Sequence, residues 1–299
     1  MRRLLDAGCR DFFVSNWAEA ASLEHLLQDG ISLSVFHGVR AEDMARAIAS
    51  RARPVLCTAD QILRWKDAGG GLCDVMVDTG MNRLGLDWRS DVAAQLNGLS
   101  VDTLLSHLAS GDEDTDLSAR QLARFSGLRA EIPAQRYSLA NSAGICLGQA
   151  YAFDLTRPGL SLYGGIPRPE AKGRIAQVVS PQAQVLQRRR VPSGDSIGYN
   201  ATYQARNDME VAILNLGYAD GYLRCFSGRG MVSAADTRLP VVGRVSMDLI
   251  AVDVSAMPSI KEGDWLDIDY DLPATSKLSG LSQYELLTSL GPRFDRVWS

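Results

Sequence analysis

Long apolar runs, blocks of like charge and paired cysteine motifs are all missing from this sequence. No apolar stretch approaches the roughly 20 residues that cross a bilayer as a helix, and Met1–Arg3 are not followed by the apolar core of a signal peptide. The net charge is −4 and the charged residues are dispersed, which does not favour a nucleic-acid surface. We therefore expect neither a membrane nor a nucleic acid as a partner.

Cysteine is scarce and scattered. The five cysteines are odd in number and form no C-x-x-C pair, which disfavours a disulfide framework and a structural zinc site. They are Cys9, Cys57, Cys73, Cys146 and Cys225. Free thiols suit a reducing compartment, so the expected location is the cytoplasm.

What is present is sufficient for two folded domains. The chain has 299 residues, of which 46% are hydrophobic, enough for one large domain or two ordinary ones. Residues 1–170 alternate short β-type runs with amphipathic stretches, which predicts a parallel sheet with crossover helices, open or closed into a barrel. The seven strand candidates are DFFVS, SLSVF, PVLC, DVMVD, VDTLLS, RYSLA and FDLT.

The pattern changes after residue 170. Over residues 171–299, apolar and polar residues alternate, and the turn signals PSGD, FSGRG and KEGD separate the runs. This alternation predicts a second domain that consists mainly of antiparallel strands.

Polar clusters directly follow four of the predicted strands. They are residues 78–83 (DTGMNR), Ser106–His107, Asn141–Ser142 and Arg157–Gly159. In parallel α/β folds the carboxyl ends of the strands open onto one face, which carries the reactive groups. We therefore expect the four clusters to lie together. The last two also offer hydroxyl and backbone N–H groups that suit an anion such as phosphate.

Each of these residues also has an ordinary structural interpretation. His107 alone is more often a packed histidine, and Ser142 serves equally well as a helix cap. Arg157 is compatible with a structural ion pair, and Tyr199, within GYNATY, with a strand aromatic. Spacing alone does not name a reaction.

Five motifs occur in order along the chain: VDTGMNRLG, RPGLSLYGG, GYNATY, LGYADGY and VGRVSMDLIAVDVS. Together with the C-terminal YELLTSLGPRFDRVW, they closely resemble the motifs of the alanine racemase family. The resemblance implies a fold-type III enzyme that depends on pyridoxal 5'-phosphate (PLP). It further implies a class of α/β plus β, with a (β/α)8 TIM-type barrel over residues 1–170 and a β domain over residues 171–299.

The family's activity and assembly follow as expectations. The resemblance implies interconversion of L-alanine and D-alanine by two bases, which supplies D-alanine for peptidoglycan. It also implies a homodimer with active sites shared across the interface, so that each site draws Tyr199 and Met247 from the partner subunit.

The resemblance also implies roles for single residues. Tyr199 matches the tyrosine base on one face of the substrate, Arg157 the arginine at the pyridine nitrogen, and His107 the histidine between these two. The implied cofactor-binding positions are Asn141, Ser142, Gly159, Leu160 and Tyr284, and the implied substrate-binding positions are Arg83, Met247 and Asp248.

These residue types suit inversion at Cα. Removing a proton from one face and returning one on the other needs two opposed bases. A free tyrosine has a pKa of about 10 and is a poor base at neutral pH, so a positive neighbour must stabilise its phenolate. Arg83, and Arg157 with His107, supply such a field. An arginine at the ring nitrogen also leaves that nitrogen unprotonated, which limits side reactions.

Two departures from the family pattern stand out. Met76 stands where the family often has a carbamylated lysine, so Asn82 or a bound anion is expected to orient Arg83. The segment with the family's PLP lysine, on the first barrel strand, has no counterpart in the sequence, and seven strand candidates stand where a barrel has eight. We expect an incomplete barrel without its first strand and, for the chain as printed, no racemase activity. The four lysines, all outside the motifs, are Lys66, Lys172, Lys261 and Lys277.

Several alternatives stay open at this point. The chain is a fragment of an active racemase, a non-catalytic relative that binds PLP or dimerises, or an enzyme that takes its lysine from elsewhere. PLP-barrel decarboxylases are disfavoured by GYNATY and SMDLIAVDVS, and single-domain PLP-binding barrels by the β domain. The sequence does not distinguish alanine from serine, or from a broader set of amino acids, as the substrate.

Overall fold

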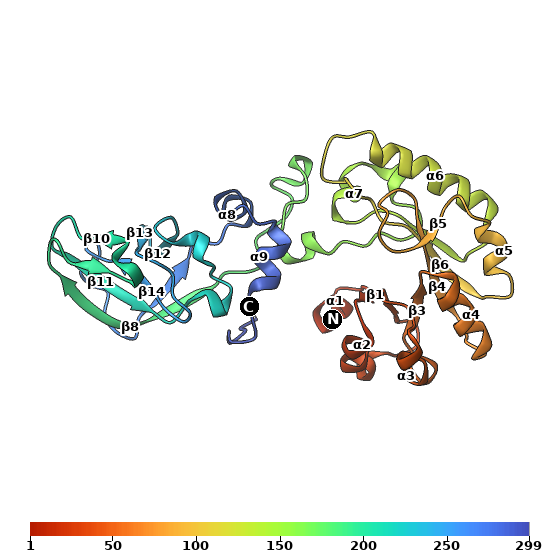
Figure 1. Ribbon diagram of the computed structural model, residues 1–299, viewed down its shortest axis with the longest axis horizontal. Coiled ribbons are helices and arrows are strands. Elements are labelled where there is room, and N and C mark those ends of the chain that lie inside the picture. The colour runs from red at the N-terminus through yellow and green to blue at the C-terminus, as the bar shows by residue number, and fades with distance from the viewer. Residues whose placement is uncertain (299) are drawn as a thin grey trace. The chain divides into compact units, whose positions relative to one another are not determined.

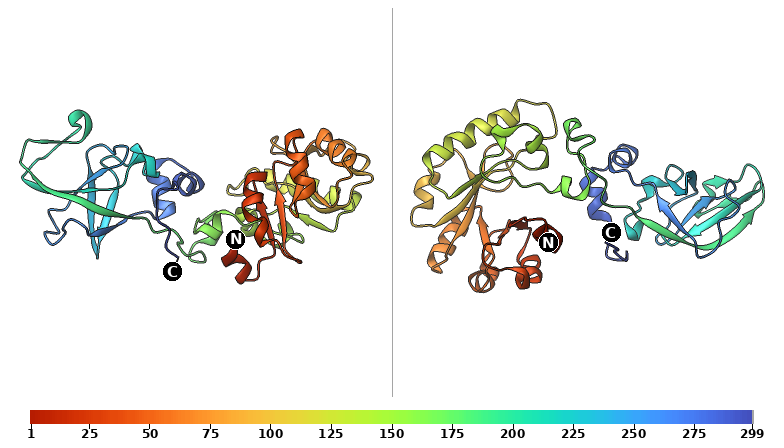
Figure 2. Two further views of the ribbon diagram at one scale, coloured as in Figure 1. Left: turned by 90° about the horizontal axis from the view of Figure 1, so that it is seen from below. Right: turned by 180° about the vertical axis from the view of Figure 1, so that it is seen from behind.

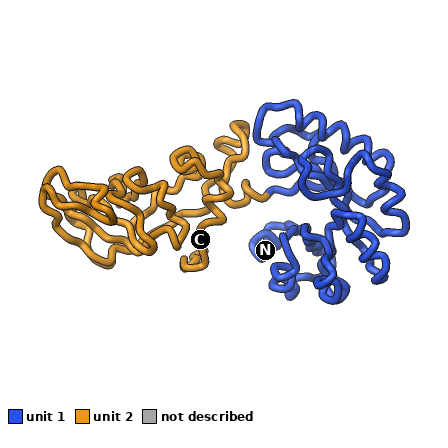
Figure 3. Tube along the Cα trace, viewed as in Figure 1, with its two compact units in different colours: residues 1–158 blue, residues 159–299 orange. Residues whose placement is uncertain are grey.

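A computed structural model describes residues 1–298 of the chain, which forms two units (Figure 1). Unit 1 is Met1–Pro158 and unit 2 is Gly159–Ser299; they are blue and orange in Figure 3. Unit 1 combines helices with a parallel sheet, and unit 2 is built mainly of antiparallel strands. The predicted class, α/β followed by β, is therefore confirmed, whereas the predicted domain limits at residues 170 and 171 stay a prediction.

Unit 1 is built on a curved sheet whose strands follow one another in sequence order (Figure 2). The order is β1-β2-β3-β4-β6-β7, with the short β5 paired to β4, and every pair is parallel. The strands are β1 (Asp11–Val14), β2 (Ser32–Val35), β3 (Arg53–Leu56), β4 (Cys73–Asp78), β5 (Leu86–Asp87), β6 (Val101–Leu105) and β7 (Arg136–Ser138). This sheet is the predicted incomplete barrel of TIM type.

The seventh strand predicted from the sequence, FDLT, is wrong. Residues 152–154 form a turn in which Phe153 has a positive φ of 50°. A residue in the left-handed region cannot continue an extended strand, so the apolar run ends in this turn. Pairing is limited to one isolated parallel bridge, between Arg157 and Asn141.

Helices flank the outer face of the sheet (Figures 1 and 2). They are α1 (Arg2–Asp6), α2 (Trp17–Leu23), α3 (Met44–Ala49), α4 (Ala59–Asp67), α5 (Val92–Leu96), α6 (Leu117–Glu131) and α7 (Ser142–Cys146). α4 begins where Thr58 Oγ1 accepts the N–H of Gln61, a side-chain cap of the first turn. Trp65 of α4 and Phe125 of α6 are buried in the core between helices and sheet. Burial of one such side chain contributes about 1.5–3 kcal/mol to stability, so the helices are held mainly by this contact with the sheet.

A network of charged side chains joins the amino ends of the strands. Arg53 lies 3.1 Å from Asp74 and 2.7 Å from Asp102. Arg136 lies 2.7 Å from both Asp102 and Asp11. Because Asp11 and Arg136 belong to the two edge strands β1 and β7, their ion pair connects edges that are not neighbours in the sheet order. The network lies at the opposite strand ends from the polar clusters, and we interpret it as structural.

Unit 2 contains a closed antiparallel barrel. Its strands follow the order β11-β14-β13-β12-β15-β8, and closure leaves no open edge. The strands of the unit are β8 (Gln182–Val191), β9 (Ser196–Ile197), β10 (Tyr203–Gln204), β11 (Met209–Leu214), β12 (Met231–Ala234), β13 (Thr237–Val242), β14 (Ile250–Asp253) and β15 (Trp265–Ile268). Two helices follow, α8 (Leu272–Ser279) and α9 (Gln283–Ser289). Within residues 1–298, no helix has both the length and the apolar character needed to traverse a membrane.

Candidate active site

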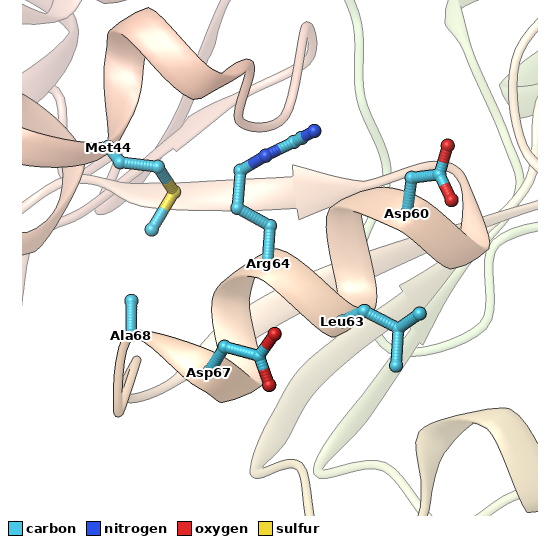
Figure 4. A pocket seen from close by; sticks show the side chains of 6 residues that line it. All are labelled: Met44, Asp60, Leu63, Arg64, Asp67 and Ala68. Carbon is cyan, nitrogen blue, oxygen red and sulfur yellow. The ribbon is translucent and has the colours of Figure 1, made fainter.

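A surface cavity of about 550 Å³ lies beside α4, on the outer face of the sheet (Figure 4). It is lined by Met44, Asp60, Leu63, Arg64, Asp67 and Ala68. None of the residues predicted to act in the site is among them. The predicted residues lie elsewhere: one set at the carboxyl ends of the strands of unit 1, and other sets in loops and a helix of unit 2.

The polar run after β4 is a loop organised by the Asp78 carboxylate. Its oxygens accept the backbone N–H groups of Gly80 at 2.8 Å, Met81 at 2.9 Å and Arg83 at 2.7 Å. Burial acts to raise the pKa of Asp78, but these donors outweigh it and hold the pKa below its usual value. Asn82 adopts the left-handed backbone conformation, with a φ of 55°, and this conformation allows the chain to turn at that position. The loop is thus an ordered structure that fixes the backbone at Arg83.

The guanidinium of Arg157 spans the carboxyl ends of β6 and β7. Nη1 donates to Ser138 Oγ, and Nη2 donates to the carbonyl oxygens of Ser106 and, at 3.5 Å, of Leu139. Burial lowers the pKa of Arg157 to about 10, a change that the Asp74 carboxylate partly opposes, so the group is a cation at neutral pH. The groups that this guanidinium contacts are a hydroxyl and two backbone carbonyls, so the interpretation as a structural ion pair is not supported.

His107 follows β6 and shares this environment. Burial, followed by the positive charges of Arg157 and Arg83, lowers the pKa of His107 to about 4. The imidazole is therefore neutral at physiological pH. A packed histidine accounts for the burial but not for two cationic neighbours, and this pairing favours a functional role.

We predict that the neutral state of His107 makes stability depend on pH. The folded pKa of about 4 lies below the unfolded value of about 6.5, so the unfolded chain binds more protons between these values and stability is lost as the pH falls through this window. Relative to a His107→Asn variant, the wild-type free energy of unfolding is expected to fall by about 2 kcal/mol between about pH 7.5 and pH 4.5. Urea denaturation of both proteins at the two pH values measures this difference, and a constant difference would contradict the prediction.

Asn141 and Ser142 open the short helix α7. Asn141 Oδ1 accepts the N–H of Gly144 at 2.9 Å and is the helix cap, while Ser142 occupies the first helical position and is buried. The interpretation of Ser142 as a mere cap is therefore wrong. The bridge between Asn141 and Arg157 brings this cluster next to the guanidinium.

In unit 2, Tyr199 lies in the loop between β9 and β10, and 66% of its surface is exposed. The next two residues, Asn200 and Ala201, have positive φ values of 61° and 48°. Each left-handed non-glycine residue costs about 1–2 kcal/mol, and such strain tends to occur at functional sites. Tyr199 is thus held outward on a constrained loop, and the interpretation as a strand aromatic is wrong.

Met247 and Asp248 follow β13 in a loop that lies against the LGYADGY motif. The Met247 carbonyl oxygen accepts the N–H of Ala219 at 3.0 Å, and a Cβ on Gly217 would lie 2.2 Å from that oxygen. The Asp248 carboxylate lies 2.9 Å from the guanidinium of Arg293. More than half of the Met247 side chain is exposed, so it is presented to whatever approaches this face.

Three of the implied cofactor-binding residues also meet within unit 2. Tyr284 lies at the start of α9, and its hydroxyl accepts the backbone N–H of Leu160. A Cβ on Gly159 would lie 2.1 Å from this hydroxyl, so any larger residue there would have to displace the Tyr284 side chain. Gln283 holds the same segment by bonds to the N–H and carbonyl of Ile166, at 2.9 and 2.8 Å. The Tyr284 hydroxyl and the backbone of Gly159 and Leu160 together form a cradle of polar groups, of the kinds that suit a phosphate.

The predicted residues therefore fall into three groups. Unit 1 brings together Arg83, His107, Asn141, Ser142 and Arg157, and unit 2 contains the Gly159–Leu160–Tyr284 group and the group of Tyr199, Met247 and Asp248. Within residues 1–298 the Asn82 side chain makes no hydrogen bond to Arg83, and the loop is held by Asp78 instead.

Gln121, which binds two of the loops in unit 1, was not among the residues predicted from the sequence. A signal for it was present: Ser118, Gln121, Phe125 and Leu128 recur at helical spacing and are all buried, so a glutamine stands on the apolar face of α6.

Comparison with known proteins gives consistent matches along the chain. Residues 1–167 match the family described as alanine racemase, N-terminal domain, and residues 178–298 match alanine racemase, C-terminal domain. The alanine racemase of Acidiphilium cryptum is 39% identical, over 98% of this chain and 86% of that protein. That of Methylobacterium nodulans is 40% identical, over 98% and 83%.

Solved structures agree with these matches. A crystal structure of the alanine racemase of Bartonella henselae with covalently bound pyridoxal phosphate matches with a TM-score of 0.90 at 33% identity, covering 98% of this chain and 86% of that one. The biosynthetic alanine racemase of Pseudomonas aeruginosa matches with a TM-score of 0.85 at 31% identity, covering 99% and 86%.

Proposed function

The chain belongs to the alanine racemase family, whose members depend on PLP, and on that premise we propose that its residues form part of a site that interconverts L-alanine and D-alanine when the second base is also present. The observation that carries the proposal is the pair formed by Arg157 and His107, a buried cation beside a neutral imidazole at the carboxyl ends of the strands. Perturbed titratable groups of this kind are typical of catalytic sites. We further propose that the product supplies D-alanine for peptidoglycan and that the protein acts in the cytoplasm.

PLP, when bound, draws electrons away from Cα of the amino acid, which allows that hydrogen to leave as a proton. The residues of this chain hold the partners and move the proton. Arg157 would face the ring nitrogen and, because it keeps its own proton at neutral pH, leave that nitrogen unprotonated. Tyr199 would take the proton from L-alanine at its hydroxyl oxygen. The Gly159–Leu160–Tyr284 cradle and Asn141–Ser142 would hold the phosphate.

Cations and N–H donors are the groups that bind a substrate carboxylate. Arg83, fixed through its backbone by Asp78, supplies the cation, and the Met247–Asp248 loop supplies the backbone at its other side. These roles follow from the family match and from the placement of each residue within its own unit.

The exposure of Tyr199 and Met247 supports a shared site. They are 66% and 54% exposed, although a proton-transferring tyrosine works in a site that excludes water. We propose that the chain forms a homodimer in which each subunit offers these two residues to its partner's site. Analytical ultracentrifugation that found only monomers under assay conditions would contradict this arrangement.

The second base that the family resemblance implies is a lysine. The lysine of unit 1, Lys66, donates to the carbonyl of Gln95 at the outer helices and lies in none of the site loops. We propose that these 299 residues bind PLP non-covalently and exchange the Cα hydrogen on the Tyr199 face alone, so that they do not racemise alanine above background. If PLP binds and no exchange occurs on either face, the alternative of a non-catalytic PLP-binding relative is correct. Parallel assays with serine test a broader specificity.

The cradle gives the direct test of PLP binding. Gly159 has a negative φ of −117°, so alanine is allowed there by the backbone, but its Cβ would collide with the Tyr284 hydroxyl. We expect Gly159→Ala to weaken PLP binding by about tenfold or more, the equivalent of one lost hydrogen bond of about 1.4 kcal/mol. Titration of each protein with PLP, followed by fluorescence quenching, measures the dissociation constant.

A matched control is Gly127→Ala on α6, where a Cβ would meet nothing within 4 Å. This variant is expected to bind PLP as the wild type does. Equal affinities for Gly159→Ala and wild type would exclude the cradle as the phosphate site.

A further inference from the structure

One fully buried glutamine of α6 contacts the loops after both β4 and β6. Gln121 Nε2 donates to the His107 carbonyl oxygen at 2.8 Å and to Thr79 Oγ1 at 3.2 Å. Gln121 Oε1 accepts the N–H of Ala109 at 2.9 Å. Both hydrogens of the amide and its oxygen are thereby used, which fixes the orientation of the group.

Hydrogen bonds continue from Gln121 to the guanidinium of the site. Thr79 Oγ1 lies 2.7 Å from Ser106 Oγ, and the Ser106 carbonyl oxygen accepts from Arg157 Nη2. Thr79, Ser106 and Gln121 are all fully buried. A buried network of this kind is stable when every member is satisfied and is costly to interrupt, because water cannot replace the lost partner.

We propose that Gln121 is a positioning residue of this site, which holds the His107 backbone and, through Thr79, the loop that ends in Arg83. It touches neither cofactor nor substrate in this role. Arg124, one turn further along α6, supports the same loop by donating to the Thr79 carbonyl oxygen at 2.7 Å. The inference rests on the proposed function, because it concerns how the loops of that site are fixed.

The test uses the titration of His107 in the full chain without PLP. The sequence has three histidines, His25, His37 and His107, so their ring signals are separable by NMR. Gln121→Met keeps the length of the side chain and removes both donors and the acceptor. The released loop is expected to admit water to the His107 ring, which would still face Arg157 and Arg83. Because burial is then reduced, the titration midpoint of His107 is expected to rise by about one pH unit or more.

The control separates positioning from stability. Leu128→Ala removes a buried side chain from the same face of α6, and Leu128 makes no bond to either loop. It is expected to lower the urea midpoint and leave the His107 titration unchanged. If Leu128→Ala shifts His107 as much as Gln121→Met does, Gln121 is merely structural and the inference is overturned.

A second variant guards against misfolding. Gln121→Asn keeps an amide but is one methylene too short to span both loops, and it is expected to shift His107 in the same direction. If a folded variant, Gln121→Met or Gln121→Asn, shows the wild-type titration midpoint of His107, the inference is overturned. Because PLP is absent from these samples, failure of the wild type to bind PLP would refute the proposed function without affecting this readout.

Discussion

Replacing Tyr199 by phenylalanine is expected to abolish exchange of the Cα hydrogen of L-alanine while leaving PLP binding intact. The substitution removes the hydroxyl oxygen that would accept the proton, and a positioned base contributes about 10²–10⁴-fold to such a transfer. We therefore expect deuterium wash-in from L-alanine, measured by proton NMR in heavy water with PLP-loaded protein, to fall at least about 100-fold. PLP affinity should persist, because Tyr284 and Gly159 form their own group.

The control is Tyr203→Phe, which changes a second tyrosine of the same hairpin, in β10. That variant is expected to exchange L-alanine at the wild-type rate. D-alanine provides a negative reference, because its Cα hydrogen faces away from the Tyr199 side and these residues offer no lysine base there, so no wash-in above background is expected from wild type or from either variant. Unchanged wash-in from L-alanine in Tyr199→Phe would show that Tyr199 is not the base.

The largest loss of stability is expected from Arg53→Met. Arg53 is 12% exposed and pairs with Asp74, which is fully buried, and with Asp102, which is 9% exposed. Removing one partner of a buried ion pair leaves an uncompensated charge and typically costs about 3–5 kcal/mol. We expect this decrease in the free energy of unfolding, measured by urea denaturation at pH 7 with tryptophan fluorescence.

The loss should also depend on pH. Burial already raises the pKa of Asp74, an effect that Arg53 opposes, so its removal raises that pKa further. A carboxyl whose folded pKa lies above its unfolded value destabilises the fold as the pH rises between the two values. The deficit of Arg53→Met is therefore expected to be greatest at neutral pH and to shrink as the pH falls.

Arg89→Met serves as the matched control. Arg89 pairs with Asp87 at 3.3 Å, but the two side chains are 63% and 56% exposed. An exposed pair contributes about 0–1 kcal/mol, so this variant should be close to wild type. If Arg53→Met and Arg89→Met lower the free energy of unfolding equally, the ion pairs of Arg53 stabilise the fold no more than an exposed pair does.

The succession of an α/β part and a β part was predictable because it depends on local patterns. Alternation of strands and helices over the first half, and of apolar and polar residues over the second, is visible in any window of the sequence. The prediction failed at FDLT, where the apolar run matched a strand but Phe153 adopts a left-handed turn. The backbone φ of a single phenylalanine is set by its surroundings in the fold, and an apolar run of residues does not specify it.

For the candidate site, too, the sequence identified residues that lie within contiguous motifs, but not the contacts that hold them. The DTGMNR run, the GYNATY motif and the RPG segment identified Arg83, Tyr199, Arg157 and Gly159 as residues of interest, since each motif is contiguous in the chain. What holds the DTGMNR loop was not visible. Asn82 or a bound anion was expected to orient Arg83, whereas the Asp78 carboxylate accepts the backbone N–H groups that shape the turn.

The sequence by itself determined the family, the cofactor and the types of residue available for proton transfer. Tertiary structure alone decided the environment that gives those residues their properties. Gln121 bonds to Thr79, 42 positions away, and Asp248 pairs with Arg293, 45 positions away. The depressed pKa of His107 likewise comes from burial and from Arg157, which approaches it only in the fold. Such contacts form because packing of the sheet and helices brings distant segments together, and no local pattern of residues specifies them.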